Sequence, residues 1–386
     1  MEGDFIKIRE SLLPLSWFYG LGVGVRNFCF DVGLLKSRSF HVPVISVGNI
    51  TVGGTGKTPH VEYLVALLKE RFRVAVLSRG YKRKTRGFFL AGENPTVHDI
   101  GDEPCQIKRK FPDVTVAVDG KRVRGIERLM DDDRRLDVIL LDDAFQHRYV
   151  KPGVNILLVD YHRLIIYDKL LPAGRLREPM KGKCRADVVI VTKCPKELKP
   201  MEFRVITKAM NLYPYQQLFF TTIDYGELQP LFPEAVSAPL GLGAVKNALL
   251  VIGIASPRQI QEDLAPHISH IESLSFPDHH QFRPKDVVRI NEAFASMEGP
   301  KIVITTEKDA VRLSTVEGLS DEVRRSLFVL PVSVRFMQEE QRKKFDDFMA
   351  GYVFKNSRHS ILAKGKEKDD GNRADAAGGS NTISFK

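Results

Sequence analysis

Short apolar runs alternate with longer segments of mixed polarity along most of the chain. Beyond residue 40, each apolar or β-branched run is followed by a polar turn and then by a segment of helical character. Near-continuous apolar runs separated by helices are typical of parallel strands that are buried on both faces. The pattern therefore predicts α/β layers, with strands at residues 44–47, 74–77, 114–118, 138–141, 156–159, 188–191, 218–221, 249–252, 302–305 and 328–332.

The length of the chain and a break in this rhythm predict two domains. The 386 residues correspond to about two or three typical domains. A stretch rich in Lys and Pro at 193–200 interrupts the alternation of strands and helices and marks a boundary. We expect one domain at residues 36–195, a smaller α/β domain at 196–350, and a disordered tail at 351–386, which is poor in large apolar residues.

The N-terminal segment at residues 12–35 is apolar but interrupted. It contains Pro14, Arg26 and Asp31, and a helix that crossed a bilayer would bury both charges at a cost of several kcal/mol each. A segment that lies in the membrane interface tolerates these charges. A helix packed on its own domain is the other interpretation. The interfacial interpretation makes residues 1–35 a membrane-associating segment, with Leu12, Leu15, Phe18, Tyr19 and Val23 toward lipid.

Composition and charge narrow the choice of partners. The chain is 43% hydrophobic and 27% charged, which is typical of a globular protein. Its 58 Lys and Arg residues exceed its 48 Asp and Glu residues by ten, so nucleotides, nucleic acids and anionic lipids are favoured partners. The four cysteines form no Cys-x-x-Cys pair, which indicates neither a zinc site nor a disulfide framework and suits a reducing compartment.

A glycine-rich loop between a predicted strand and a predicted helix carries the strongest chemical signal. Its glycines allow backbone amides to turn toward phosphate oxygens, and the following helix adds its N-terminal dipole. Lys57 would then reach the β- and γ-phosphates, and the Thr58 hydroxyl would bind Mg²⁺. The usual pattern has glycine where this chain has Thr51, so an ordinary glycine turn is the alternative. The predicted nucleotide-binding residues are Thr51, Val52, Gly53, Gly54, Thr55, Gly56, Lys57 and Thr58.

A pair of carboxylates follows the predicted strand at 138–141. Asp142 and Asp143 stand where a phosphate-transfer site needs a metal-binding carboxylate, at the end of a rigid strand. Because adjacent strand residues point to opposite faces, at most one of them can bind the ion directly unless the strand has already ended. We predict Asp142 as a metal ligand together with Thr58. A solvated turn with two free acids is the alternative.

Two groups of residues could face the acceptor of the phosphate. Asp102 and Glu103 precede a predicted helix, where a capping role alone could explain them. Later in the chain a turn carries Asp278, His279 and His280, and an Asp-His pair of this kind is commonly structural. A carboxylate near an imidazole is also a plausible general base for a hydroxyl nucleophile.

Basic residues gather in two places. Residues 71–90 contain seven Lys and Arg residues, among them Arg79, and no acid. Arg175 and Arg177 form a second patch beside Glu178. Such clusters are either solvated loops or docks for an anionic surface, which here would be a lipid headgroup or a substrate phosphate.

Taken together, these motifs resemble the tetraacyldisaccharide 4′-kinase family of lipid A biosynthesis. The resemblance runs over about residues 10–345, and each motif alone is weak, whereas their order and joint presence are specific. Thr51 is no departure within this family, whose phosphate loop is similar to this one. The segments that carry the resemblance are 14–20, 47–59, 77–81, 101–104, 141–147, 174–178, 278–279 and 305–311.

The resemblance implies a reaction, a location and a fold. The reaction is transfer of the γ-phosphate of ATP, with Mg²⁺, to the 4′-hydroxyl of an acylated glucosamine disaccharide 1-phosphate. The location is the cytoplasmic face of the bacterial inner membrane, on an anionic membrane surface. The fold is two α/β/α domains, the N-terminal one a P-loop type parallel sheet, preceded by a membrane-associating helix.

The resemblance also implies roles for residues. Asp102 would be the acceptor-side base, supported by His279 or by its neighbour His280. Asp142 and Asp143 would belong to the metal and catalytic end of their strand, and Lys57 would act on the transferred phosphate. The candidates for contact with the acceptor are Arg79, Arg175, Arg177 and Glu178.

Two other classes of protein share some of these features. A membrane-associated P-loop switch ATPase would release free phosphate and phosphorylate no acceptor. A basic nucleic-acid-binding ATPase is disfavoured, because the sequence contains no nucleic-acid module signature and Tyr81 is the one aromatic residue interleaved among the basic residues at 79–86. We therefore expect no nucleic-acid partner, and we infer no obligate protein partner.

Overall fold

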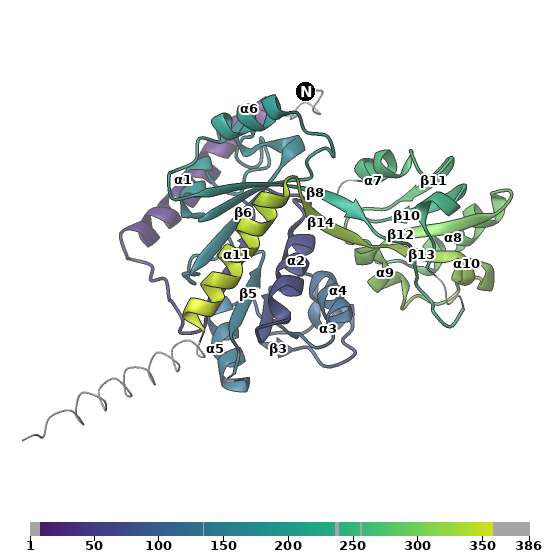
Figure 1. The fold of residues 1–386 in the computed structure, drawn as a ribbon, viewed down its shortest axis with the longest axis horizontal. Helices are drawn as coiled ribbons and strands as arrows, with labels where there is room; N and C mark the ends of the chain where they lie inside the picture. Colours follow the sequence, from purple (N-terminus) through teal and green to yellow (C-terminus); the bar gives the residue numbers. More distant parts are fainter. Residues whose placement is uncertain (1–7, 134, 236–238, 255–256, 358–386) are drawn as a thin grey trace, which may run out of the picture.

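Two α/β units make up the chain (Figure 1). The computed structural model describes residues 8–133, 135–235, 239–254 and 257–357. Each unit is built on a largely parallel sheet with helices on both faces, and we call them the first and the second domain. The fold class expected from the spacing of apolar runs is thereby confirmed.

Nine strands of the described chain form the sheet of the first domain, in the order β14-β8-β7-β6-β1-β5-β2-β4-β3. All neighbours are parallel except the edge pairs β14·β8 and β3·β4. The strands are β1 Val44–Gly48, β2 Val74–Ser78, β3 Phe89–Leu90, β4 Thr115–Val118, β5 Val138–Asp142, β6 Val154–Asp160, β7 Val188–Thr192, β8 Gln217–Tyr225 and β14 Val332–Phe336.

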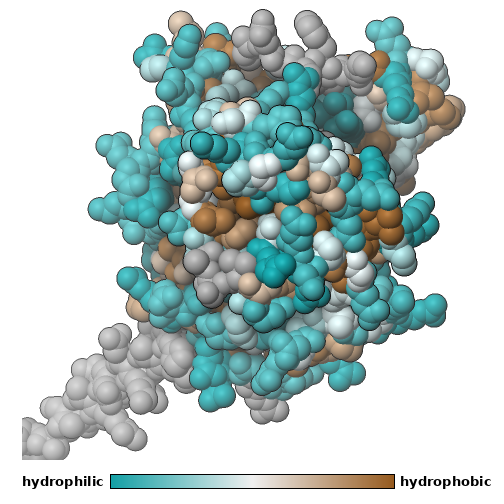
Figure 2. Space-filling model, turned by 90° about the vertical axis from the view of Figure 1, so that its right-hand side faces the viewer, coloured by the Kyte–Doolittle hydropathy of each residue, from teal (hydrophilic) through white to brown (hydrophobic). Residues whose placement is uncertain are grey.

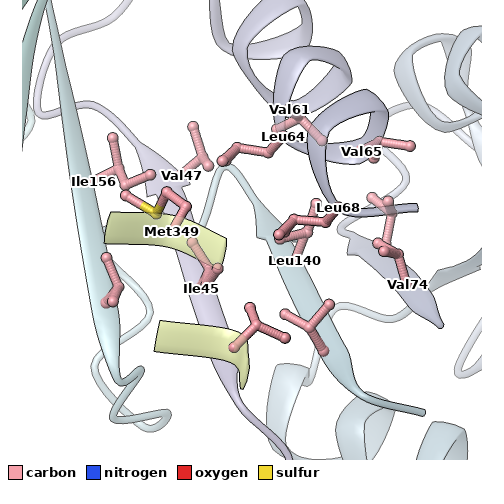
Figure 3. Close-up of a cluster of buried hydrophobic side chains, with 14 of the residues drawn as sticks. Ile45, Val47, Val61, Leu64, Val65, Leu68, Val74, Leu140, Ile156 and Met349 are labelled. Carbon is pink, nitrogen blue, oxygen red and sulfur yellow. The ribbon is translucent and has the colours of Figure 1, made fainter. Parts of the chain in front are cut away.

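Helices cover both faces of this sheet. The helices α2 (Lys57–Lys69), α4 (Asp102–Lys110) and α11 (Glu339–Asn356) share one apolar cluster with the sheet. The helices α5 (Arg122–Asp132) and α6 (Pro200–Met210) pack on the opposite face. Each fully buried aliphatic side chain contributes about 1.5–3 kcal/mol. Figure 3 shows α2 and α11 meeting the strands through Ile45, Val47, Val61, Leu64, Val65, Leu68, Leu140, Ile156 and Met349.

The second domain has a smaller sheet in the order β11-β10-β12-β13-β9, parallel except for β9. Seen from this end, the surface is mainly hydrophilic, with small hydrophobic groups between polar side chains (Figure 2). Its strands are β9 Gln229–Pro230, β10 Asn247–Ile252, β11 His270–Ser275, β12 Lys301–Thr306 and β13 Leu327–Leu330. Its helices are α7 Pro257–Leu264, α8 Pro284–Ser296, α9 Glu307–Leu313 and α10 Asp321–Ser326.

The chain crosses between the domains later than the expected boundary at residue 195. The break at 193–200 is only the connection from β7 to α6, and both α6 and β8 belong to the first domain. The chain enters the second domain after β8, returns through β14, and ends its described part with α11 on the first sheet. The amino-acid composition does not change where the chain leaves the first domain, because it leaves through β8, which is one continuous strand.

Pro331 divides the strand expected at 328–332. The residues before it form β13 in the second sheet, and the residues after it form β14 in the first sheet. Proline cannot donate a hydrogen bond to a ladder, so it suits the point where the chain leaves one sheet for the other. The tail expected at 351–386 begins inside α11, which continues to Asn356, and residues 358–386 lie outside the described residues.

The helix α1 (Leu13–Asp31) runs along the outside of the first domain (Figure 1). The buried Ser16 fixes it, because its hydroxyl donates to the Leu170 carbonyl at 2.9 Å and accepts from the Ala173 amide at 3.0 Å. In the described part of the chain, no helix is both long and apolar enough to cross a bilayer. The remaining short helices are α3 Val97–Ile100, η1 Glu10–Leu12, η2 Tyr161–Arg163, η3 Ile165–Tyr167, η4 Met180–Arg185 and η5 Leu242–Ala244.

The outward side of α1 differs in part from the expected lipid-facing set. Leu15 and Phe18 are exposed, as expected. Tyr19 and Val23 instead line a cavity, and the Tyr19 hydroxyl donates to the Arg177 carbonyl at 2.7 Å. The cause is the helical period, since residues on the same side as Ser16 turn toward the domain. Other exposed apolar side chains on and beside this helix are Leu13, Trp17, Leu21, Val25, Phe28, Val32 and Leu34.

Candidate active site

A large cavity lies between the two domains. Its volume is about 1340 Å³. Small-ligand sites usually measure about 300–1,000 Å³, so this cavity has room for two substrates at once. Its walls come from α1, the loop after β1, the carboxyl ends of β2 and β5, α4 and α9. Of the predicted site residues, those on the wall are Val52, Gly53, Gly54, Thr55, Gly56, Lys57, Thr58, Arg79, Asp143, Arg175, Arg177, Glu178 and His279.

The glycine-rich loop joins the central strand β1 to α2 and has the backbone of a phosphate cradle. Gly53 has φ 124° and Gly56 has φ 77°, values that L side chains rarely adopt, and Gly56 is the residue just before α2. Inside the loop, the Asn49 amide donates to the Thr55 hydroxyl at 2.8 Å. Free amides at a helix N-terminus bind phosphate oxygens. The loop therefore has a backbone that could hold phosphate, and its binding of nucleotide stays a prediction.

Lys57, the first residue of α2, faces the end of β5. Its Nζ lies 3.6 Å from Oδ1 of Asp143. Asp143 has φ 46°, so the strand has ended at Asp142 and the two carboxylates no longer alternate across it. Burial alone would raise the pKa of Asp143, but the charges of Lys57, Arg177 and Arg122 lower it below its ordinary value. Asp143 is thus an ionised partner for the lysine.

Asp142, the last residue of β5, is fully buried beside Ser78. The Ser78 hydroxyl donates to its Oδ2 at 3.1 Å, while within the described residues its Oδ1 has no hydrogen-bond partner. Burial raises the pKa of Asp142 to about 7, and the carboxylates of Glu103 and Asp143 add to this shift. A buried carboxylate with an unpartnered oxygen and acidic neighbours is stabilised by a cation.

The residues near Asp142 fit Mg²⁺ bound together with a phosphorylated ligand. Across the parts of the chain that the structure describes, no group of three or more His, Cys, Asp or Glu side chains is arranged to hold a metal alone. Mg²⁺ needs no such group, because it keeps waters and takes one or two carboxylates plus phosphate oxygens. Asp142 and the Thr58 hydroxyl, which follows the loop, are of the right chemistry for this role.

Asp102 and His279 meet across the domain boundary. Asp102 is the first residue of α4 in the first domain, and Nδ1 of His279 lies 2.7 Å from its Oδ2. Arg312 of α9 lies 3.9 Å from the same oxygen. Burial would raise the pKa of Asp102, but the hydrogen bond from His279 and the charge of Arg312 outweigh it and lower that pKa. Asp102 is therefore ionised at neutral pH.

The contacts of Nε2, the other ring nitrogen of His279, show which of the two nitrogens carries the proton. The Lys308 ammonium lies 3.1 Å from Nε2 of His279 and 2.9 Å from Oδ1 of Asp278. An ammonium can only donate, so Nε2 accepts and Nδ1 carries the proton that is donated to Asp102. His280 points elsewhere, because its Nε2 lies 2.9 Å from Asp286. Of the two histidines, the structure places His279 beside Asp102.

The predicted acceptor-side residues differ in whether their charged side chains are available to contact a ligand or are held by other residues. Arg79 is exposed on the wall of the cavity. Arg177 lies 3.5 Å from Asp143, and the Arg175 carbonyl accepts from the Val52 amide at 2.8 Å, which places that chain segment beside the loop. Glu178 is 2% exposed and its carboxylate accepts from Arg185 at 2.7 Å. Glu178 therefore supports the cavity wall more than it presents a free charge.

Two charged residues on the cavity wall, Lys308 and Arg122, are not predicted from the sequence as individual site residues. Lys308 belongs to the segment 305–311, which follows an apolar run, and this position is the signal that could have identified it. Arg122 is 2% exposed and donates to the Asp142 carbonyl at 3.0 Å and the Asp119 carbonyl at 2.6 Å. Burial lowers the pKa of Arg122 to about 10. An arginine inside a helical pattern carries no sequence signal for such a place.

Comparisons with known proteins agree with this geometry. A model of the family "Tetraacyldisaccharide-1-P 4'-kinase" (LpxK) matches residues 8–350. A tetraacyldisaccharide 4′-kinase of Phocaeicola vulgatus is 55% identical over 364 residues, which cover 93% of this chain and 99% of that protein. A tetraacyldisaccharide 4′-kinase of Bacteroides thetaiotaomicron is 53% identical over 374 residues, which cover 94% and 98%.

A solved structure is similar over most of the chain. It is LpxK from Aquifex aeolicus in complex with ATP, with a TM-score of 0.67 and 32% sequence identity. The match covers 88% of this chain and 99% of that one. Both domains therefore have a counterpart of known structure.

Proposed function

The chain belongs to the tetraacyldisaccharide-1-P 4′-kinase family, and on that premise we propose how its residues divide the reaction between them. It is an ATP-dependent kinase that phosphorylates the 4′-hydroxyl of the tetraacyldisaccharide 1-phosphate precursor of lipid A. One observation supports the proposed division most strongly. The phosphate loop and His279 border the same cavity from different domains, and His279 lies 2.7 Å from the buried Asp102 behind that wall.

The loop at Val52–Thr58 binds the phosphates of ATP in this proposal. Loop amides beyond Val52, whose own amide donates to the Arg175 carbonyl, face the phosphate oxygens, and Lys57 leaves Asp143 to reach the β- and γ-phosphates. The exchange keeps the lysine paired with a negative group both before and after the nucleotide enters. Asp142 and the Thr58 hydroxyl would hold Mg²⁺ together with phosphate oxygens, and the ion would supply positive charge that offsets the charge developing on the transferred group.

Asp102 accepts the proton of the 4′-hydroxyl. A sugar hydroxyl is a weak nucleophile near pH 7, and a positioned base contributes about 10²–10⁴-fold to the rate. His279 donates to Asp102 through Nδ1, which orients the carboxylate. Lys308 on the other side of the ring keeps that proton on Nδ1. The base Asp102 is thus held by two further side chains in series, His279 and Lys308.

The arginines Arg79, Arg175 and Arg177 contact the anionic acceptor in this proposal. All three border the cavity, and Arg177 lies beside α1, where the Tyr19 hydroxyl donates to its carbonyl. Guanidinium groups suit phosphate, because their fork of donors matches its oxygens. We assign no direct contact to Glu178, which is held by Arg185.

We also propose that α1 lies on the anionic surface of the cytoplasmic face of the bacterial inner membrane. Its exposed Trp17 and Phe18 have exposed fractions of 86% and 73%, which favours burial in lipid. The same helix lines the cavity through Tyr19 and Val23. A lipid acceptor would thus meet the site beside the surface that binds the bilayer.

A matched pair of substitutions tests the membrane proposal. Phe18→Glu should lower binding to vesicles with anionic lipid by about tenfold or more, because a buried phenylalanine contributes about 1.5–3 kcal/mol. Phe354→Glu replaces a similarly exposed phenylalanine, 66% exposed, on α11 and should leave binding unchanged. Vesicle sedimentation measures both. Equal binding by Phe18→Glu and the unmodified chain would contradict the proposal.

The destination of the phosphate tests the reaction. Incubation with γ-labelled ATP, Mg²⁺ and a detergent-solubilised tetraacyldisaccharide 1-phosphate should place the label on the 4′ position of the lipid. A P-loop switch ATPase would release labelled free phosphate and leave the lipid unlabelled. Chromatography of the lipid fraction, followed by mass spectrometry of the product, separates these outcomes. The expectations of no nucleic-acid partner and no obligate protein partner stay predictions.

A further inference from the structure

Three successive carbonyls of the phosphate loop are held by side chains. The Gly54 carbonyl accepts from the Lys193 ammonium, and the Thr55 carbonyl accepts from the Thr192 hydroxyl at 3.0 Å. Nδ1 of His60, one turn into α2, lies 2.7 Å from the Gly56 carbonyl. A loop whose amides face a phosphate must turn its carbonyls away from it. These contacts therefore fix the orientation that phosphate binding needs.

His60 has a defined protonation state and a second partner. It is 4% exposed, and burial lowers its pKa to about 4, so the ring is neutral at pH 7. The Gly56 carbonyl can only accept, so Nδ1 carries the proton. Nε2 is then an acceptor, and it lies 3.0 Å from the Thr221 hydroxyl, which donates to it. The imidazole thus joins the loop to Thr221 with both nitrogens satisfied.

Thr221 lies on β8, one of the two strands that connect the domains. It is fully buried, and it pairs with Phe336 of β14, the strand that returns from the second domain. The next residue on β8, Thr222, borders the cavity. The Thr221 side chain is instead committed to His60. A short path of hydrogen bonds therefore runs from the Gly56 turn to the strands between the domains.

We propose that His60 is a positioning residue that holds the Gly56 turn of the phosphate loop by anchoring it to Thr221 on β8. The inference deepens the proposed function and rests on it, because the turn matters only where the loop binds phosphate. It assigns a role in nucleotide affinity to two residues that lie behind the loop. Neither residue need touch the nucleotide.

Removal of the Thr221 hydroxyl tests the anchor. Thr221→Val keeps the shape of the side chain and should weaken ADP binding, measured by calorimetry, by about three- to tenfold, the range for one lost buried hydrogen bond. Thr221→Ser keeps the hydroxyl and should restore affinity to within about twofold. Thr305→Val is the control, because Thr305 is also fully buried and donates to a strand carbonyl, that of Val251, in the second domain. It should bind ADP like the unmodified chain.

A double substitution tests whether the two residues act as one path. In His60→Asn the amide can still donate to the Gly56 carbonyl, but it is too short to reach Thr221. Adding Thr221→Val to His60→Asn should therefore cause less than a twofold further loss of ADP affinity. Additive losses, or equal losses in Thr221→Ser and Thr221→Val, would overturn the proposal. So would unchanged ADP affinity in a folded Thr221→Val protein.

The same measurements separate this inference from the proposed function. If the unmodified chain binds ADP and phosphorylates the lipid while Thr221→Val binds ADP equally well, only the anchor fails. If the unmodified chain binds no ADP, the nucleotide site itself fails and the anchor with it. Thermal unfolding of each variant without nucleotide shows whether a loss of affinity comes from a loss of fold.

Discussion

Replacing Asp102 with asparagine should lower kcat by about 10²–10⁴-fold, the usual contribution of a general base. The amide keeps the size of the side chain but cannot take the proton of the 4′-hydroxyl. The contact with His279 at 2.7 Å should persist in a weaker form, so the fold should change little. Steady-state kinetics with saturating ATP and detergent-solubilised acceptor measure the effect.

The neighbouring histidine provides the control for this prediction. His280 and Asp286 form a similar pair at 2.9 Å within the second domain, and this pair is not part of the proposed chemistry. Asp286→Asn should therefore keep kcat within about threefold of the unmodified chain. A folded Asp102→Asn protein with unchanged kcat would remove Asp102 from the role of base.

Replacing Lys57 with methionine should lower kcat by about 10²–10³-fold. The loss is comparable to removing one preorganised group that stabilises the charge of a transition state. Methionine keeps the apolar stem while it removes the ammonium that would reach the β- and γ-phosphates. Lys69→Met, at the far end of the same helix, is the matched control and should turn over normally.

A second substitution separates two causes of that loss. Without Lys57, which lies 3.6 Å away, the Asp143 carboxylate keeps only Arg177, at 3.5 Å, as an ion-pair partner, and its charge would repel the triphosphate more strongly. In Lys57→Met with Asp143→Asn this repulsion is absent, and kcat should still be low if the lysine acts on the transferred phosphate. Recovery of kcat in the double variant would show that Lys57 serves only to neutralise Asp143.

Most of the first sheet follows from the sequence for a simple reason. A parallel strand covered on both faces must be apolar throughout, as in β1, β5 and β7, whose residues are all buried. The second sheet is harder to predict, because β11 lies at its edge and contains His270 and Glu272. An edge strand with polar residues has no continuous apolar run. Its pattern is therefore that of a loop.

The domain organisation depends on contacts that a local pattern does not contain. The helix α11 follows the second domain in the chain, yet its Phe345 and Met349 pack with Val61 of α2. Only the assembled sheet shows that β14 lies against β8. For this reason the sequence places the boundary at the Pro-rich break near residue 195 and leaves α11 outside the first domain.

The candidate site divides in the same way. The phosphate loop is predictable because glycines and a lysine lie together in sequence, between a strand and a helix. The Asp102–His279 contact joins residues 177 positions apart, and spacing alone leaves His280 as an equal choice. Here family resemblance supplied the pairing, and the structure separates the two histidines. His60 has no signal at all, because in sequence it is one polar residue near the start of a largely apolar helix.

The contact between Asp102 and His279 has a consequence for how much ATP is lost to water when no acceptor is bound. Asp102 and the phosphate loop belong to the first domain, and His279 belongs to the second. If the two domains separate, the Asp102 carboxylate loses the hydrogen bond from His279, whereas the phosphate loop of the first domain is unchanged. We therefore expect water to hydrolyse ATP slowly in such an open form, because the proposed base is oriented only when the two domains meet around both substrates.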